Sequence, residues 1–284
     1  MPLDYVSNLI DQVPENLDFN LGYEPTKVAD KKYVINTDTG EYLGVVGNDF
    51  NTETHTKFFN KVQDTMLEKL SPYEVEGATV NWKSAKNNAW ALMDITLPNV
   101  TTKITTDRHE TTVAQRIISL RAVDGSCSNQ VFFGAIDFFC TNGMIRGEHD
   151  KVRRKNTSGF SVERFASQLR KSNEDFQMQT RRLQEWANRS LATVDVRAFL
   201  EKLMGSERAA DKMFILYNPE VSTRGRNVFA LYSAFTNYAT YADERNGFTM
   251  RNTGHDTAAV TMFNRENKVG QWIDSSHFQK LVAA

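Results

Sequence analysis

The chain has 284 residues, of which 40% are apolar and 24% charged, and its formal net charge is −1. This composition is typical of an ordinary globular protein and excludes a disordered chain; the length allows one large domain or two small ones. The balanced charge also excludes attraction of the whole molecule to nucleic acid or to an anionic membrane. Any such binding must come from a local patch.

The first 32 residues contain three of the six prolines and no sustained periodicity. They predict an extended N-terminal arm over residues 1–32, either with one short helix or with an amphipathic turn packed on the body. The opening residues lack the basic start and long apolar stretch of a signal peptide, and no apolar run reaches the ~20 residues of a membrane span. The missing apolar run leads us to expect no membrane partner. Cys127 and Cys140 lie far apart in register, so we expect reduced thiols and a cytoplasmic location.

Residues 33–145 predict a sheet region built from hairpins. Two strands flank the turn at residues 37–40, and a helix capped by Asn51 or Thr52 carries apolar residues at helical spacing up to Ser71-Pro72. Strands at 78–83 and 89–97 are joined by a turn at 86–88, and the threonine-rich residues 101–112 are expected to be a connection. The order hairpin, helix, hairpin favours a helix laid across one face of an antiparallel sheet.

The longest hairpin is expected at residues 115–142, with its turn at Asp124-Gly125-Ser126. An Asp-Gly pair tolerates the positive φ that tight turns need. The returning strand has few polar residues on either face, and it includes Phe132, Phe133, Phe138 and Phe139. Such a strand is typical of the centre of a sheet that is covered on both sides.

Residues 146–284 predict a mainly helical region, either separate from the sheet or sharing one core with it. Helices are expected at 160–191, 194–204, 207–216, 227–243, 258–263 and 275–282, with Asn218-Pro219 ending the third. The helix at 227–243 is rich in tyrosine and phenylalanine, and we interpret it as an aromatic surface. The predicted fold class is therefore α+β, with a largely antiparallel, hairpin-rich sheet, a crossing helix and a helical C-terminal half.

Three segments in the expected order resemble one protein family. They are Leu43-Gly44-Val45-Val46-Gly47 followed by the helix with Phe58-Phe59, the strand end Phe138-Phe139-Cys140-Thr141-Asn142-Gly143, and Leu231-Tyr232-Ser233-Ala234-Phe235-Thr236-Asn237-Tyr238. Together they resemble the phage- and plasmid-borne proteins grouped as domain of unknown function 932. Asp137 stands where the family strand usually has arginine, and Lys155-Asn156-Thr157-Ser158-Gly159 is similar to its His-Thr-Gly element without the histidine. The resemblance implies a bacteriophage protein acting in the cytoplasm of a bacterial host, and no known activity.

The strongest charge signal follows the long hairpin. Residues 146–182 contain ten basic and five acidic side chains. Such a cluster can neutralise nucleic-acid phosphates, but a solvated helix face with paired charges is the interpretation that general experience with charge runs favours. The candidate nucleic-acid-binding residues are Arg146, Lys151, Arg153, Arg154, Lys155, Arg164, Arg170 and Lys171.

We identify no catalytic residue, metal ligand set or cofactor motif. The five histidines are scattered, no Cys-x-x-Cys pair exists, and both phosphate-binding glycine patterns are absent. Asp94, Asp107 and Asp137 could hold a catalytic metal ion, although pairing of a strand acid to Arg116 or Arg121 explains such residues as well.

The leading hypothesis is a phage accessory protein of DNA metabolism that binds single-stranded DNA, promotes recombination or annealing, and forms a homo-oligomer. Phage single-strand annealing proteins are similar in outline. A non-enzymatic structural or inhibitory protein that binds a host factor through the aromatic helix is the second hypothesis, and a metal-dependent nuclease is the third. A non-enzymatic role is favoured over an enzymatic one.

Overall fold

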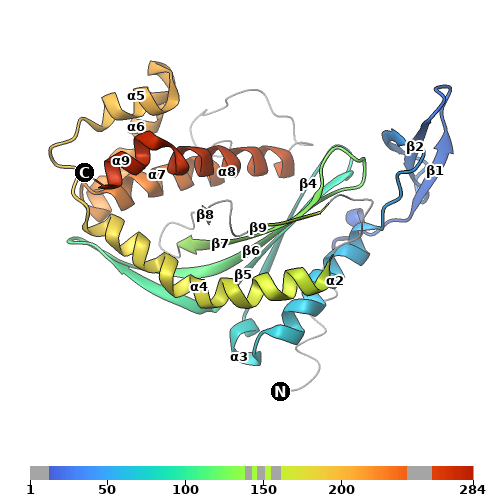
Figure 1. Cartoon of the computed structure of the whole chain (residues 1–284), viewed down its shortest axis with the longest axis horizontal. Helices are drawn as coiled ribbons and strands as arrows, with labels where there is room; N and C mark the ends of the chain where they lie inside the picture. Colours follow the sequence, from blue (N-terminus) through green and yellow to red (C-terminus); the bar gives the residue numbers. More distant parts are fainter. Residues whose placement is uncertain (1–12, 138–142, 146–150, 155–160, 242–257, 284) are drawn as a thin grey trace.

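The computed structural model describes residues 13–137, 143–145, 151–154, 161–241 and 258–283. Figure 1 shows a twisted sheet between two layers of helices, with α2 and α4 on one side and α7 and α8 on the other. The described helices and strands are η1 (Glu15–Leu17), β1 (Leu21–Pro25), β2 (Lys31–Asn36), β3 (Tyr42–Gly47), α2 (His55–Lys69), α3 (Pro72–Val75), β4 (Thr79–Ala85), β5 (Trp90–Thr105), β6 (Glu110–Ala122), β7 (Asn129–Asp137), β8 (Gly143–Ile145), β9 (Lys151–Arg154), α4 (Val162–Asn188), α5 (Val196–Met204), α6 (Glu207–Arg224), α7 (Val228–Tyr241), α8 (Ala258–Asp274) and α9 (Ser276–Ala283).

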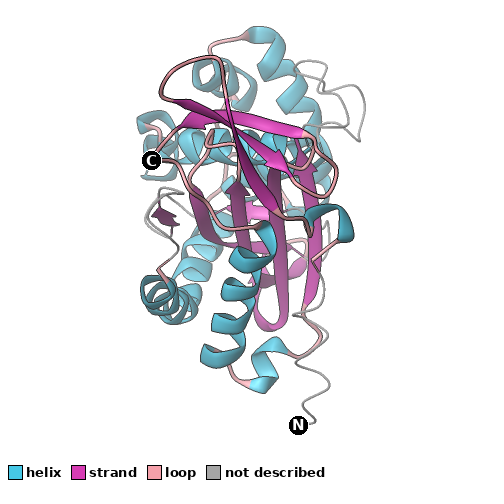
Figure 2. Cartoon of the chain, turned by 90° about the vertical axis from the view of Figure 1, so that its right-hand side faces the viewer, coloured by secondary structure: helices cyan, strands magenta, loops and turns pink. Residues whose placement is uncertain are grey.

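The strands form two antiparallel sheets. The larger has the order β4-β5-β6-β7-β8, and β9 also pairs with β7. The smaller has the order β1-β2-β3 and lies at the end of the molecule opposite α5 and α6 (Figure 1). Figure 2, viewed from that end, shows the small sheet in front of the strands of the large one. The predicted α+β class is therefore confirmed.

Strand alternation explains how the large sheet is covered. Met93, Ile95 and Ile117 face α2 and the first half of α4, where they pack with Phe59 and Phe165. The intervening residues on the same strands, among them Leu92, Ile118 and Leu120, pack with residues of the small sheet. Both faces of β5 and β6 are thus buried, which explains why these strands lack a clean alternation of polar and apolar residues.

The third cluster joins the sheet to the helical half. It contains Ile104, Val113 and Ala135 from the strands together with Phe176 of α4 and most of α7. The residues on the two sides of position 146 therefore pack in one shared core.

Several element boundaries differ from the prediction. The arm predicted over residues 1–32 contributes η1 and β1, and β1 pairs with β2 from Leu21–Asn36 to Pro25–Lys32. Thr54 caps α2, in place of Asn51 or Thr52, because its hydroxyl accepts a bond from the backbone N–H of Lys57. That helix ends at Lys69 with Leu70 as its C-cap, and Ser71 forms a capping box with Glu74 at the start of α3.

Two predicted breaks lie inside regular structure. The segment 101–112 is mostly paired strand, since β5 runs to Thr105 and β6 begins at Glu110. Threonine is β-branched and favours strands, so its abundance here indicated sheet, not a connection. Pro219 lies inside α6, which continues to Arg224.

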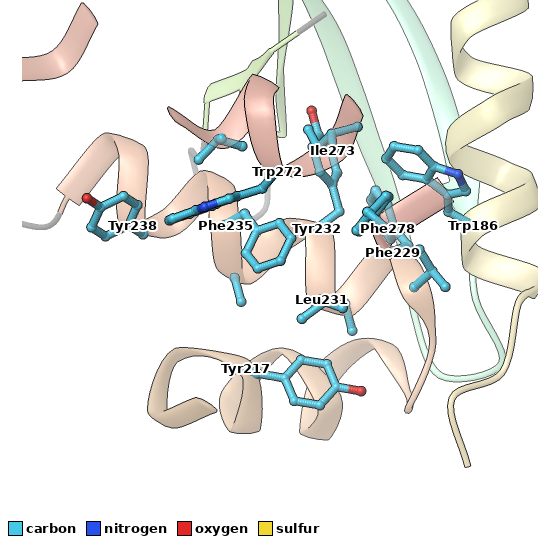
Figure 3. Close-up of a cluster of buried hydrophobic side chains, with 14 of the residues drawn as sticks. Trp186, Tyr217, Phe229, Leu231, Tyr232, Phe235, Tyr238, Trp272, Ile273 and Phe278 are labelled. Carbon is cyan, nitrogen blue, oxygen red and sulfur yellow. The ribbon is translucent and has the colours of Figure 1, made fainter. Parts of the chain in front are cut away.

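The aromatic helix is buried, so its interpretation as a surface was wrong. Phe229, Tyr232, Phe235 and Tyr238 of α7 are each at most 3% exposed. Figure 3 shows Tyr232 and Phe235 surrounded by aromatic side chains of other helices. Trp186 meets the Tyr232 ring edge-on at 5.1 Å between centroids. α7 is therefore the central helix of the C-terminal half.

Candidate nucleic-acid interface

The basic segment of the sequence begins at one edge of the large sheet. β8 pairs with β7 opposite Gly134–Ile136, and β9 pairs with β7 opposite Asn129–Phe132. Since β6 occupies the other side of β7, β8 and β9 are successive parts of the same edge. β9 has the sequence Lys-Val-Arg-Arg, which places three basic residues and no acidic one in the edge strand.

α4 follows this edge and crosses the sheet. Ser161 caps the helix by accepting a bond from the backbone N–H of Arg164. Phe165, Leu169 and Phe176 are buried on its inner side. Arg164 and Lys171 are exposed, and the spacing of about two helical turns places them on the same outer face. Arg181 and Arg182 are also exposed, further along the helix.

The eight predicted binding residues can now be placed. Arg146 and Lys155 lie outside the described residues. Lys151, Arg153 and Arg154 occupy β9, opposite Phe132, Gln130 and Asn129, and Arg170 lies on α4. Arg164 and Lys171 are the two whose exposure is described. None of the described ion pairs involves Arg164, Lys171, Arg181 or Arg182.

The aromatic residues near this edge are mainly structural. Phe133 is 2% exposed and stacks on Phe165 with 6.1 Å between ring centroids. Phe132 is partly buried against the core below the small sheet, and Phe138 and Phe139 lie outside the described residues. The described aromatic residues of β7 are therefore part of the core.

Other charged groups are buried in the interior, among them Arg116, Arg121 and Arg224, each of which lies close to at least one carboxylate. Arg116 of β6 donates from Nε and Nη2 to the two carboxylate oxygens of Asp94 at 2.7 and 2.6 Å. Its Nη1 donates to Glu266 of α8 at 3.0 Å. Burial opposes ionisation of Arg116, but the two carboxylates outweigh it and hold its pKa above the ordinary value.

A second arginine joins the end of β7 to α6. Arg224 donates from Nη2 to Asp137 at 2.7 Å and from Nε to Glu220 at 2.8 Å. The Arg224 and Asp137 side chains are 1% and 0% exposed. Asp137 therefore has a structural partner, and that partner is Arg224, not Arg116 or Arg121.

A third buried arginine fixes the start of α2. Arg121 donates to Thr52 at 2.8 Å, to Asn129 at 3.1 Å and to the backbone carbonyl of Glu53. Burial lowers its pKa to about 10, partly offset by the Glu53 carboxylate. Burial and the nearby Arg121 charge likewise lower the pKa of His55 to about 3. The His55 ring is therefore neutral, and its Nε2 donates to the carbonyl of Asn88 at 2.8 Å.

These contacts bear on the nuclease hypothesis. Asp94 and Asp137 are both bonded to buried arginines, so they do not converge on a common open position for a metal ion. Within the described ranges, no three His, Cys, Asp or Glu side chains gather as a metal site requires. In the same residues, no helix is both long and apolar enough to cross a lipid bilayer.

Comparison with known proteins gives one match. The model of the family described as domain of unknown function 932 matches residues 42–280. The chain belongs to that family. No curated protein and no solved structure matches the chain. The match begins at Tyr42, the first residue of β3, so β1 and β2 precede it.

Membership of domain of unknown function 932 confirms the predicted resemblance. The segment Leu43–Gly47 forms most of β3, and Leu231–Tyr238 lies in the buried helix α7. Asp137, where the resemblance led us to expect an arginine, is in the ion pair with Arg224. The lysine-to-glycine segment 155–159 lies outside the described residues.

Sequence reasoning missed the helical partners of the buried arginines. Glu266, Glu220 and Arg224 are far from the sheet in the sequence, and none occurs in a recognisable motif. One available signal was their position on otherwise apolar helix faces, where a charged residue requires a partner.

Proposed function

We propose that this protein binds single-stranded DNA through the basic sheet edge at β9 and the outer face of α4. The observation that carries the proposal is the adjacency of three basic positions in β9 to a helix whose Arg164 and Lys171 are exposed on one face. In the full proposal, the protein is a bacteriophage accessory protein of recombination or annealing, acts in the cytoplasm of a bacterial host, and is a homo-oligomer.

Phosphate neutralisation is the physical basis of the proposed binding. Lysine and arginine release condensed counterions from the DNA, so the affinity falls as salt is added. For single strands the slope of log K against log salt is about −0.7 per neutralised phosphate. Because the described aromatic residues of β7 belong to the core, the proposal assigns them no stacking role and leaves the bases open to pairing with a complementary strand.

The decisive experiment measures binding of a fluorescent oligothymidylate by anisotropy over a series of salt concentrations. We expect binding at low salt that weakens steeply as salt rises. The double variant R164E/K171E should lower the affinity by at least about tenfold and reduce the salt slope.

The matched control is K202E/K268E, which makes the same change of charge at two exposed lysines on α5 and α8. It should bind nearly as well as the wild type. Absence of binding by the wild type at low salt, or equal losses in the two double variants, would overturn the proposal.

Residues first considered for the two alternatives have other contacts in the fold. A host-factor surface on α7 requires exposed aromatic residues, and these are in the core. A nuclease centred on Asp94 and Asp137 requires open carboxylates, and both are bonded to arginine.

A further inference from the structure

The outward face of the small sheet carries exposed apolar side chains. Tyr42 is 57% exposed and Val45 is 55% exposed. Tyr42 lies opposite Ile35 on the neighbouring strand. Val45 lies opposite Tyr33, and the register irregularity between these two pairs keeps all four side chains on one face. The Tyr42 ring meets the Tyr33 ring at 4.8 Å between centroids, and its hydroxyl donates to Glu24 at 3.0 Å. These five residues form an ordered surface, which we call the tyrosine platform.

The surroundings of the tyrosine platform are acidic. Residues 20–50 contain five acids and three lysines, and five minus three leaves a net charge of −2. The acids lie on the face itself and at both ends of the strands, and all of them are exposed: Glu24, Asp30, Asp38, Glu41 and Asp49. A negative surface repels a polyanion such as DNA, and it favours a partner surface that carries positive charge.

A surface of the opposite sign lies on the C-terminal half of α4. Met178 is 60% exposed. Arg181 and Arg182 follow it by three and four residues, so they are its neighbours on the helix surface, and both are exposed. The Arg182 guanidinium lies over the Trp186 ring at 4.8 Å from its centroid, which holds it in place. Residues 176–190 contain three arginines and one glutamate, and three minus one leaves +2. We call Met178, Arg181 and Arg182 the arginine patch.

The two surfaces are complementary in chemistry. Each has an exposed apolar centre next to charged groups, and the charges have opposite signs. An apolar centre with a polar rim is the usual composition of a protein interface, and tyrosine, methionine and arginine are enriched there. Figure 1 shows the small sheet at one end of the molecule and α4 running away from it toward α5. One copy therefore cannot bring its own two surfaces together, whereas two copies can.

We propose that the tyrosine platform of one copy docks on the arginine patch of a second copy. This inference rests on the homo-oligomer of the proposed function and supplies its contact surfaces. Because the two surfaces differ, the contact is head-to-tail, and each added copy leaves one platform and one patch open at the ends. Contacts of this kind build rings when the rotation closes and filaments when it does not.

The arginine patch adjoins the candidate DNA-binding surface and uses different residues. Met178 follows Lys171 by seven residues, which is about 10 Å along the axis of α4. Assembly measured without DNA therefore reports on the platform and the patch alone. Its failure is distinguishable from a failure of DNA binding, which has its own variants and its own measurement.

Analytical ultracentrifugation of the full chain, without DNA and at low salt, tests the proposal. We expect the wild type to associate as its concentration rises, and to associate less when salt screens the exposed charges. V45K places a cation against the arginines of the next copy. R181E/R182E places two acids against the acidic platform. Each variant should raise the dissociation constant at least about tenfold, because like charges then meet across the interface.

A mixture of the two variants is the sharper measurement. In the mixture, the V45K platform can dock on the R181E/R182E patch with opposite charges, and the two unchanged surfaces can dock on each other. The mixture should therefore associate about as strongly as the wild type, although neither variant does so alone. Such recovery would also show that both variants are folded and that no other component is needed.

Two matched controls accompany the variants. V28K makes the same change as V45K at a valine that is 62% exposed in the turn between β1 and β2. K202E/K268E reverses two exposed charges on α5 and α8. Both controls should associate like the wild type. A wild type that is monomeric at all concentrations, variants that associate no more weakly than their controls, or a mixture that associates no more than its components would each overturn the proposed contact.

Discussion

Arg116 and Glu266 are 150 residues apart in the chain, and their side chains meet at 3.0 Å in the interior. Asp94 already neutralises Arg116 through two hydrogen bonds, so Glu266 adds a second negative charge to one guanidinium. This contact fixes α8 to the strands of the large sheet, and it makes the attachment sensitive to ionisation.

Glu266 should make stability decrease as pH rises above the ordinary pKa of a glutamate, 4.5. Burial raises its pKa, and the Asp94 charge raises it further against the opposing effect of Arg116. A carboxyl whose folded pKa exceeds its unfolded value stabilises the fold below the unfolded pKa, and this contribution is lost as pH rises through the folded value. E266Q keeps an acceptor for Arg116 without the charge. Urea unfolding should show that the wild type loses stability relative to E266Q as pH rises.

E266A is the informative comparison for this site. It leaves the buried Nη1 of Arg116 without its acceptor and should cost about 1–3 kcal/mol at every pH. Equal pH profiles for the wild type and E266Q would contradict the role given to the Glu266 charge.

His55 should make stability fall in acid. Its pKa of about 3 in the fold lies below the ordinary value of 6.5, so the unfolded chain binds a proton that the folded chain excludes. Stability is therefore constant above about pH 6.5 and decreases as pH falls toward 3, by an amount on the order of 4 kcal/mol. H55Q retains an N–H donor for the Asn88 carbonyl and should remove this part of the pH dependence. Thermal unfolding of the wild type and H55Q between about pH 4 and pH 8 measures this pH dependence.

R224L should destabilise the fold by about 3–5 kcal/mol, because it leaves Asp137 and Glu220 close together in the interior without their cation. R208L, at an exposed position of the same helix, should change the free energy of unfolding by less than about 0.5 kcal/mol. Chemical denaturation compares the two. Similar values for both variants would mean that the Arg224 contacts contribute little.

F235A tests the assignment of α7 to the core. The ring is fully buried and lies 5.4 Å from that of Trp272 between centroids, so its removal leaves a cavity and should cost about 3–5 kcal/mol. I215A removes a side chain that is 65% exposed and should cost less than about 1 kcal/mol. If α7 were an exposed binding surface, F235A would instead leave the unfolding free energy nearly unchanged.

Local chemistry made much of the fold predictable. The Asp124-Gly125 turn, the strands around Lys86-Asn87-Asn88 and the long helix α4 follow from residues close together in the sequence. Gly125 and the three turn residues at 86–88 all have positive φ, as such turns require. The α+β arrangement follows from the order of these elements.

What depends on distant contacts was harder to predict. Whether the aromatic residues of α7 face solvent or a core is decided by α8, α9 and α4, which pack around it. The partner of Asp137 was likewise undetermined, since Arg224 is 87 residues away. For the candidate site, the sequence predicted the basic residues, and the structure added that Arg164 and Lys171 share an exposed face.

The edge-on contact between Trp186 and Phe278, with 5.3 Å between ring centroids, also limits when the protein can fold. During synthesis the indole of Trp186 leaves the ribosome long before residue 278 has been added. Until then this part of the aromatic cluster remains incomplete, and newly made chains would present it to chaperones and to one another.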